Sequence, residues 1–215
     1  MSDYDTVLFD LDGTILNSIE LILDSYRHTL SAHGLPPRTD DDVLSGLGQT
    51  LEDQFVRWFG ATAPVEALIA TYVAHNLENH DRLTSPYPGV TELIHRLDAR
   101  GVPMAIVTSK RRQGALRGLE RLDLRAAFRV VVGADDVTRH KPDPAPVLLA
   151  LERLGRSAGR GVVFVGDATH DLHAGRAAGV STIAVTWGAA DREALAAAHP
   201  DHLVDTADEL ARLLG

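Results

Sequence analysis

The chain has 215 residues, 45% of them hydrophobic, which is enough for one main core and a small accessory domain. It contains no cysteine, so disulfides, thiolate metal ligands and cysteine nucleophiles are excluded. A formal net charge of −9 argues against nucleic-acid binding but permits a locally cationic site for a small anionic substrate. The acidic first residues and the lack of a long apolar run predict a cytoplasmic protein that does not bind membranes.

The first predicted strand, residues 6–9, is followed directly by Asp10, Asp12, Gly13 and Thr14. Two carboxylates this close together resist joint ionisation, so we expect a cation, most simply a divalent metal, between them. The glycine permits a sharp backbone turn, and the threonine adds a hydroxyl. A helix cap and an ordinary turn use the same residue types, so this segment alone leaves both interpretations open.

A helical insert follows the first strand. Residues 17–82 contain no clear strand, and their apolar residues recur at helical spacing. The predicted helices cover residues 19–30, 50–59 and 65–79. We expect this insert to form a cap over a core built from residues 1–16 and 83–215.

Four more strands are predicted in the second part of the chain. They are short apolar runs at residues 104–107, 130–132, 162–165 and 182–185. Amphipathic stretches of helical length, such as 144–154 and 171–178, lie between the later runs. Strands that alternate with helices predict an α/β fold with a parallel sheet that is covered on both faces.

Polar and charged residues follow each of the relevant strands. Thr108, Ser109 and Lys110 follow residues 104–107, Lys141 comes after 130–132, and a segment from Asp167 to Asp171 follows 162–165. Ligands of open parallel sheets bind outside the carboxyl ends of the strands. Only two of the 21 basic residues are lysines, and both fall at these positions. This convergence favours a single active site over a set of unrelated turns.

These residue types suit phosphoryl transfer. A carboxylate such as Asp10 can act as a nucleophile and form an aspartyl-phosphate. Asp10, Asp167 and the main-chain carbonyl of Asp12 offer the oxygen ligands that Mg²⁺ prefers. Lys141 can neutralise the transferring group, and the Thr108 hydroxyl can bind phosphoryl oxygens. The Asp12 side chain remains free to protonate the leaving oxygen and later to activate water.

Each residue also has a structural interpretation. Thr108 can be a helix cap, Lys141 can belong to a surface turn, and Asp171 can stabilise the start of a helix. We expect His170 and His173 to be helix residues that face solvent, because carboxylates already supply the predicted metal ligands.

Four motifs in order resemble those of the haloacid dehalogenase superfamily, specifically its capped phosphatases of the phosphoglycolate phosphatase type. The motifs are Asp10-Leu11-Asp12-Gly13-Thr14, Thr108 with Ser109-Lys110, Lys141-Pro142-Asp143-Pro144, and Gly166-Asp167 with Asp171. The resemblance covers essentially the whole chain. It implies a Rossmann-like parallel-sheet core with a small all-helical cap inserted after the first strand.

The resemblance also implies roles for individual residues. Asp10 is expected to be the nucleophile and a metal ligand, and Asp12 the general acid and base with its carbonyl on Mg²⁺. Thr108 and Lys141 would bind the phosphoryl group. Asp167 would be the second metal carboxylate, with Asp171 also at the metal site. The further substrate contacts are expected from Thr14, Ser109, Lys110, Gly48 and Gln49, the last two in a cap loop over residues 46–50.

The expected activity is hydrolysis of a small anionic phosphorylated metabolite by a monomer or homodimer. Residues 17–22, 75–80 and 187–203 look closer to the pyrophosphatase branch of the family, so an inorganic pyrophosphatase is one alternative. A β-phosphoglucomutase-like phosphomutase is another, although Thr14 favours hydrolysis. A dehalogenase would need neither Asp12 nor Asp167. A phosphoaspartate receiver module is the alternative from a different class, but it would be shorter and would have no helical insert.

Overall fold

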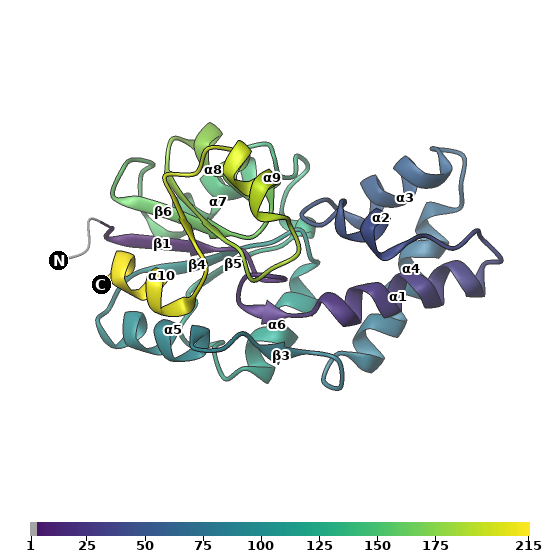
Figure 1. Cartoon of the computed structure of the whole chain (residues 1–215), viewed down its shortest axis with the longest axis horizontal. Helices are drawn as coiled ribbons and strands as arrows, with labels where there is room; N and C mark the ends of the chain where they lie inside the picture. Colours follow the sequence, from purple (N-terminus) through teal and green to yellow (C-terminus); the bar gives the residue numbers. More distant parts are fainter. Residues whose placement is uncertain (1–3) are drawn as a thin grey trace.

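The computed structural model describes residues 4–215 and contains a six-stranded parallel sheet, with the helices of residues 17–82 to one side of it (Figure 1). The strand order is β5-β4-β1-β6-β7-β8. The strands are β1 (Thr6–Phe9), β4 (Met104–Val107), β5 (Val130–Val132), β6 (Val162–Gly166), β7 (Ser181–Val185) and β8 (His202–Val204). In this register Val7 of β1 lies opposite Met104 on one side and Val163 on the other. The predicted α/β fold with a parallel sheet is confirmed.

Helices cover both faces of the sheet, which explains why its central strands are buried along their whole length. Val7 and Phe9 point to the face that is covered by α5 (Val90–Ala99), α6 (Arg112–Arg121) and α10 (Ala207–Leu214). Leu8 points to the other face, under α7 (Ala145–Leu154) and α8 (Thr169–Ala178). A shorter helix, α9 (Arg192–Ala197), packs near β7, and a 3₁₀ turn, η1 (Ala134–Asp136), follows β5.

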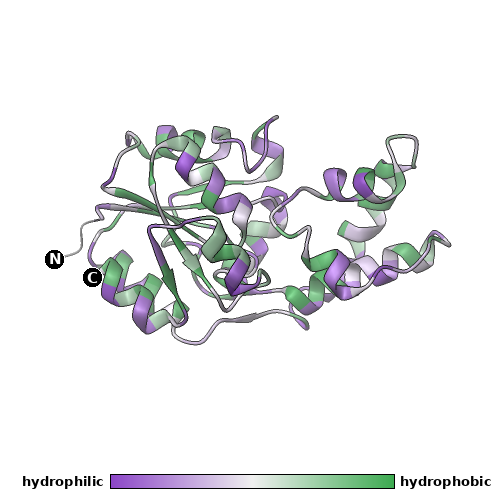
Figure 2. Cartoon of the chain, turned by 45° about the horizontal axis from the view of Figure 1, so that its top comes forward, coloured by the Kyte–Doolittle hydropathy of each residue, from purple (hydrophilic) through white to green (hydrophobic). Residues whose placement is uncertain are grey.

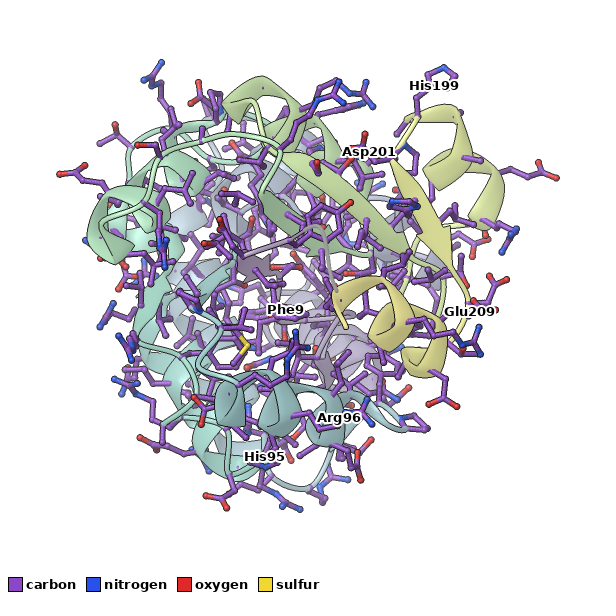
Figure 3. All side chains as sticks on the ribbon, turned by 90° about the vertical axis from the view of Figure 1, so that its left-hand side faces the viewer. Phe9, His95, Arg96, His199, Asp201 and Glu209 are labelled. Carbon is purple, nitrogen blue, oxygen red and sulfur yellow. The ribbon has the colours of Figure 1, made fainter. Side chains whose placement is uncertain are left out.

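The hydropathy of the elements follows this layering. The strands at the middle of the sheet are mostly hydrophobic, whereas the helices carry both hydrophilic and hydrophobic residues (Figure 2). Seen from the end of the molecule, Phe9 lies in the interior, and the exposed side chains His95, Arg96 and His199 lie at the periphery (Figure 3). Among the described residues, no helix combines the length and the hydropathy that crossing a bilayer requires.

The insert after the first strand is a group of four helices that lies beside the sheet (Figure 1). They are α1 (Ile19–Ala32), α2 (Asp40–Leu44), α3 (Leu51–Phe59) and α4 (Val65–Asn79). They enclose a hydrophobic core of their own, in which Tyr26 packs edge-on against Phe55 and Tyr72. Helix α2 was not predicted, although it begins with a capping box between Thr39 and Asp42.

A two-stranded antiparallel ribbon forms where the chain leaves the core and returns to it. Strand β2 (Leu16–Asn17) pairs with β3 (Ser85–Pro86), so Asn17 lies opposite Ser85. The expectation that the segment from residue 17 contains no strand is therefore wrong at its first residue. A strand of two residues is too short to show the alternation of inward and outward side chains that marks a strand in a sequence. Strand β2 is recognised only by its pairing with β3, at the other end of the insert.

Candidate active site

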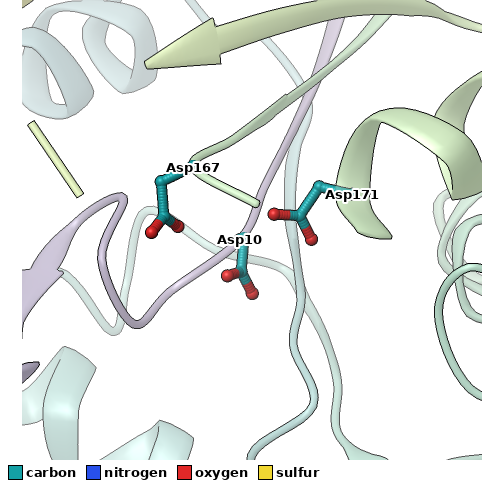
Figure 4. A group of neighbouring side chains, drawn as sticks. All are labelled: Asp10, Asp167 and Asp171. Atoms are coloured by element: carbon teal, nitrogen blue, oxygen red, sulfur yellow. The ribbon is translucent and has the colours of Figure 1, made fainter. Parts of the chain in front are cut away.

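Three carboxylates meet at the carboxyl edge of the sheet. Asp10 follows β1, Asp167 follows β6, and Asp171 lies in the first turn of α8 (Figure 4). All three are buried, and one oxygen of each lies within 4.8 Å of one oxygen of the others. Asp12, which we expected to share a metal with Asp10, does not bring its side chain into this cluster.

Lys141 supplies the positive charge inside this cluster. Its ammonium donates to Asp171 Oδ1 at 2.6 Å, to Asp10 Oδ1 at 3.0 Å and to the carbonyl of Val107 at 3.3 Å. Burial by itself lowers the pKa of Lys141, but the two carboxylates outweigh it and raise that pKa above the ordinary value. Lys141 is therefore a permanent cation between two carboxylates. The structure places Lys141 beside Asp10, where the sequence predicted it.

The donor set fits a divalent cation. When all three carboxylates are ionised, the one ammonium leaves two uncompensated negative charges in a buried space, and a divalent cation would balance them. Burial raises the pKa of Asp10 well above its ordinary value, and burial with the charge of Asp171 raises the pKa of Asp167 to about 7. Both Asp171 oxygens are engaged, one by Lys141 and the other by the main-chain N–H of Ala168. Asp167 also accepts on both oxygens, but only from neutral donors, the Thr14 hydroxyl and the Ala189 N–H, and Asp10 accepts from Lys141 on one oxygen. Asp10 and Asp167 are therefore the carboxylates that would hold Mg²⁺.

The carboxylate of Asp12 lies at the same edge but has different partners. Lys110 donates to its two oxygens at 2.9 and 3.2 Å, and the Ser18 hydroxyl donates to Oδ1 at 2.6 Å. We expected Lys110 to contact the substrate, and the structure places its ammonium on Asp12 at the cavity wall. Lys110 and Asp12 both line the cavity, with side chains 12% and 14% exposed.

Thr14 and Gly13 hold Asp167 in place. The Thr14 hydroxyl donates to Asp167 Oδ1 at 2.9 Å, and Thr14 is 1% exposed and is not part of the cavity wall. Gly13 has a φ of +83°, and a Cβ atom there would lie 2.1 Å from Asp167 Oδ2. The sequence predicted a substrate contact for Thr14, and the structure shows a contact to a candidate metal ligand instead.

The loop after β7 completes the surroundings of Asp167 and was missed from the sequence. The main-chain N–H of Ala189 donates to Asp167 Oδ2 at 3.0 Å, and the indole of Trp187 donates to the carbonyl of Thr14 at 3.0 Å. A Cβ atom at Gly188 would lie 2.3 Å from the Asp167 side chain. Main-chain donors leave no pattern of residue types, but Gly188, three residues after the end of β7, was a usable signal.

A cavity of about 450 Å³ extends from these carboxylates into the helical insert. Asp10, Asp12, Thr108 and Ser109 line its core side. The predicted cap loop, residues 46–50, lines the opposite side. The loop and the carboxylates therefore face one space, as the sequence predicted.

Two contacts join this loop to the core. The Ser109 hydroxyl donates to the carbonyl of Gly48 at 2.6 Å, and the Gln49 amide lies 3.5 Å from His170 Nε2. His170 was expected to face solvent, but it is partly buried under the loop, and burial lowers its pKa. That expectation is wrong because the insert folds over the start of α8. His173, one turn further on, is exposed as predicted.

Comparison with known proteins identifies relatives over the full length of the chain. A family model described as haloacid dehalogenase-like hydrolase matches residues 7–185. The chain is 36% identical over 213 residues to pyrophosphatase PpaX of Halalkalibacterium halodurans, which covers 99% of this chain and 98% of the relative. Identity to pyrophosphatase PpaX of Bacillus pumilus is 38% over 216 residues, or 100% of this chain and 98% of that protein.

Solved structures show the same fold. A haloacid dehalogenase-like hydrolase from Bacteroides fragilis superposes with a TM-score of 0.89 at 31% identity, over 96% of this chain and 99% of the other. A predicted phosphoglycolate phosphatase from Haemophilus somnus gives a TM-score of 0.89 at 24% identity over the whole of both chains. At that identity the second likeness shows the fold alone.

Proposed function

Because the chain belongs to the haloacid dehalogenase-like hydrolases, we propose that it is a Mg²⁺-dependent phosphatase that acts through an aspartyl-phosphate on Asp10. The observation that carries this proposal is the position of Asp10. Its buried carboxylate lies at the carboxyl end of β1, on the wall of the cavity, with Lys141 on Oδ1. Within residues 4–215 the structure gives Oδ2 no hydrogen-bond donor, so that oxygen is free to attack phosphorus.

The reaction has two halves. In the first, Asp10 Oδ2 forms a bond to phosphorus as the bond between phosphorus and the leaving oxygen breaks, and Asp12 gives the leaving oxygen a proton. In the second, Asp12 takes a proton from water, whose oxygen attacks the phosphorus and releases Asp10 and inorganic phosphate. Lys110 and Ser18 hold the Asp12 carboxylate at the cavity wall for both transfers.

The phosphoryl group would be bound by Lys141 and the Thr108 hydroxyl. Both residues are buried at the carboxyl edge of the sheet, and Thr108 lines the cavity beside Asp10. Asp10 and Asp167 would hold Mg²⁺, with the carbonyl of Asp12 as a third ligand. When bound there, the ion supplies positive charge against the phosphoryl oxygens. Asp171 keeps Lys141 in place, and Thr14 does the same for Asp167.

We assign residues 4–16 and 83–215 to a core domain and residues 17–82 to a cap domain; residues 1–3, which the predicted core also includes, lie outside the described residues. The separate hydrophobic core of α1 to α4 supports this division. Closure of such a cap excludes bulk water while the phosphoryl group is transferred. The contact of Ser109 with Gly48 then corresponds to the closed position.

The test is phosphate release from a panel of small phosphorylated compounds, measured with Mg²⁺ and with a chelator. The panel contains phosphoglycolate, pyrophosphate, sugar phosphates and an aryl phosphate. We expect Mg²⁺-dependent release by the wild type and none by Asp10→Asn, which keeps the shape of the side chain but is not a nucleophile. Turnover that survives in Asp10→Asn would rule out the assigned nucleophile.

A pyrophosphatase is the second candidate, and the relatives support it. The proteins named pyrophosphatase PpaX are 36% and 38% identical to this chain over nearly its full length. The same panel separates the two candidates, because a pyrophosphatase prefers pyrophosphate to every monoester. Conversion of one sugar phosphate into another without net phosphate release would point instead to a phosphomutase.

A further inference from the structure

Most side chains on the cap side of the cavity are apolar, and the polar ones there are Gln49, Thr50, Glu52, Asn76 and the phenols of Tyr26 and Tyr72. Helix α4 contributes Ile69, Val73 and Leu77, which recur every four residues and therefore lie on one face of the helix. All three are only partly buried, whereas Leu68 and Tyr72 of the same helix are buried in the cap core. The stripe thus lines the cavity with its exposed part, while Ile69 and Val73 also pack against the cap core.

Two further elements complete this wall. Ile22 and Tyr26 of α1 face the cavity from beside α4, and Leu47 closes it from the cap loop. We call the space bounded by Ile22, Tyr26, Leu47, Ile69, Val73 and Leu77 the apolar chamber. The apolar chamber and the wall formed by Asp10 and Asp12 belong to one cavity. When the phosphoryl group of a substrate lies at Asp10, its leaving group can therefore extend into the chamber.

The charges on the wall are distributed unevenly. The cations that line the cavity within the described chain are Lys110 and Arg111, and both come from the core segment after β4. Lys110 is already paired with Asp12. Residues 17–82 contribute a single charged side chain to the wall, the anion Glu52. A second phosphoryl group or a carboxylate in the leaving group would therefore enter the chamber without a cation from the cap, at a large desolvation cost.

We infer that the preferred substrate is a phosphate monoester whose leaving alcohol is apolar, alkyl or aromatic, and occupies the apolar chamber. This inference rests on the proposed phosphatase activity and names its substrate class. The size of the cavity agrees, since about 450 Å³ falls within the roughly 300–1,000 Å³ of pockets that hold drug-sized ligands. The inference favours neither pyrophosphate nor phosphoglycolate, whose leaving groups are anionic.

The experiment compares kcat/KM for methyl, butyl, hexyl and phenyl phosphate with that for pyrophosphate and phosphoglycolate, all with Mg²⁺. We expect kcat/KM to rise with alkyl length by up to about fourfold per methylene, which corresponds to about 0.8 kcal/mol for each methylene buried. Both anionic compounds should be poorer substrates than hexyl phosphate. Values that do not change with chain length, or a preference for pyrophosphate, would overturn the inference.

A pair of matched variants locates the effect. Val73→Thr places a hydroxyl in the apolar chamber with almost no change of shape, and we expect it to reduce the dependence on chain length. Val56→Thr makes the same substitution at a cap residue that is 37% exposed and outside the cavity wall, and it should leave that dependence unchanged. If both variants reduce the dependence on chain length equally, or if neither reduces it, the leaving group does not occupy the apolar chamber.

Binding of hexylphosphonate, which cannot be hydrolysed, tests the chamber without turnover. Calorimetry should give tighter binding than for methylphosphonate and a more negative heat-capacity change, the mark of buried apolar surface. If the wild type releases phosphate from no compound, the proposed phosphatase fails and the substrate class falls with it. If it releases phosphate but the two phosphonates bind equally and chain length has no effect, only the substrate class fails.

Discussion

The hydroxyl of Ser109 donates to the main-chain carbonyl of Gly48 at 2.6 Å and so joins the segment after β4 to the cap loop. Ser109 follows Thr108, which is assigned to the phosphoryl group, and both line the same cavity. Because this hydrogen bond joins the two sides of the cavity, we expect movement of the cap loop to change the position of the residues that bind the phosphoryl group.

Removing this hydrogen bond should favour the open cap. We expect Ser109→Ala to lower kcat/KM by about two- to tenfold, the range that corresponds to a net hydrogen-bond contribution of about 0.5–1.5 kcal/mol. Amide hydrogen exchange in residues 46–50 should become faster at the same time. Ser157→Ala, at an exposed loop position, is the control and should change neither quantity. Unchanged exchange in the Ser109 variant would show that the bond does not hold the loop.

A side chain at Gly13 should displace Asp167. Gly13→Ala brings a Cβ atom to 2.1 Å from Asp167 Oδ2, and we expect kcat to fall by about a hundredfold, as for other small displacements of reacting groups. Gly34→Ala is the matched control, because Gly34 also has a positive φ but has nothing within 4 Å. Both variants carry the cost of a left-handed alanine, about 1–2 kcal/mol. Equal kcat values in the two variants would contradict this role of Gly13.

Lys141 should matter for stability as well as for activity. Lys141→Met leaves the buried carboxylates of Asp10 and Asp171 without their cation, and we expect it to lower the free energy of unfolding by about 3–5 kcal/mol. Arg139→Met removes an ion pair of a side chain that is 73% exposed, and it should cost less than about 1 kcal/mol. Urea unfolding in the presence of a chelator measures both. If the Lys141 variant is as stable as the wild type, Asp10 and Asp171 must take up protons when the cation is absent, and the ion pairs then contribute no net stability.

Metal binding should raise thermal stability through the carboxylates of the site. An ion that binds only the folded chain stabilises it by about 2.7 kcal/mol when its free concentration is about 100 times Kd. We expect Mg²⁺ to raise the Tm of the wild type and to have little effect on Asp167→Asn. Asp98→Asn, at an exposed position of α5, should keep the full response. An equal response of the Asp167 variant would place the ion elsewhere.

The ion pair between Asp81 and Arg117 should make a pH-dependent contribution to stability. Arg117, at 3.2 Å from both carboxylate oxygens, and His80 lower the pKa of Asp81 to about 2. A depressed pKa stabilises the fold above the unfolded-state value of about 3.9, and the contribution is lost as the pH falls toward 2. The Asp81 side chain is 55% exposed, so we expect less than about 1 kcal/mol.

Unfolding of Asp81→Asn and of the wild type at several pH values tests this. The difference in free energy of unfolding should be largest above pH 5 and should shrink between about pH 4 and pH 2. A difference that grows on acidification has the wrong sign for a depressed pKa and would contradict the assignment.

The parts of this molecule that the sequence predicted have local causes. Strands β1, β4 and β5 have the predicted bounds because short apolar, β-branched runs buried on both sides are hard to mistake. Asp10, Thr108 and Asp167 converge because each follows a parallel strand, and the carboxyl ends of such strands share one edge.

The parts that the sequence did not predict depend on pairing between distant segments. Lys110 pairs with Asp12, 98 residues away in the chain, and Thr14 contacts Asp167, 153 residues away. The half-buried stripe of Ile69 and Val73 has the same helical spacing as core residues, so no pattern separates a cavity wall from a packed interior. His170 is covered only because the cap loop folds across α8.

The ribbon of β2 and β3 has a consequence for how such a chain can change over evolutionary time. Because Asn17 and Ser85 lie opposite each other, the segment between them begins and ends at one point of the molecule. An insertion whose two ends meet can be lengthened, shortened or exchanged without moving the strands on either side. The segment that we propose selects the substrate can therefore be exchanged as one unit, while the carboxylates at the sheet edge keep their positions through every exchange.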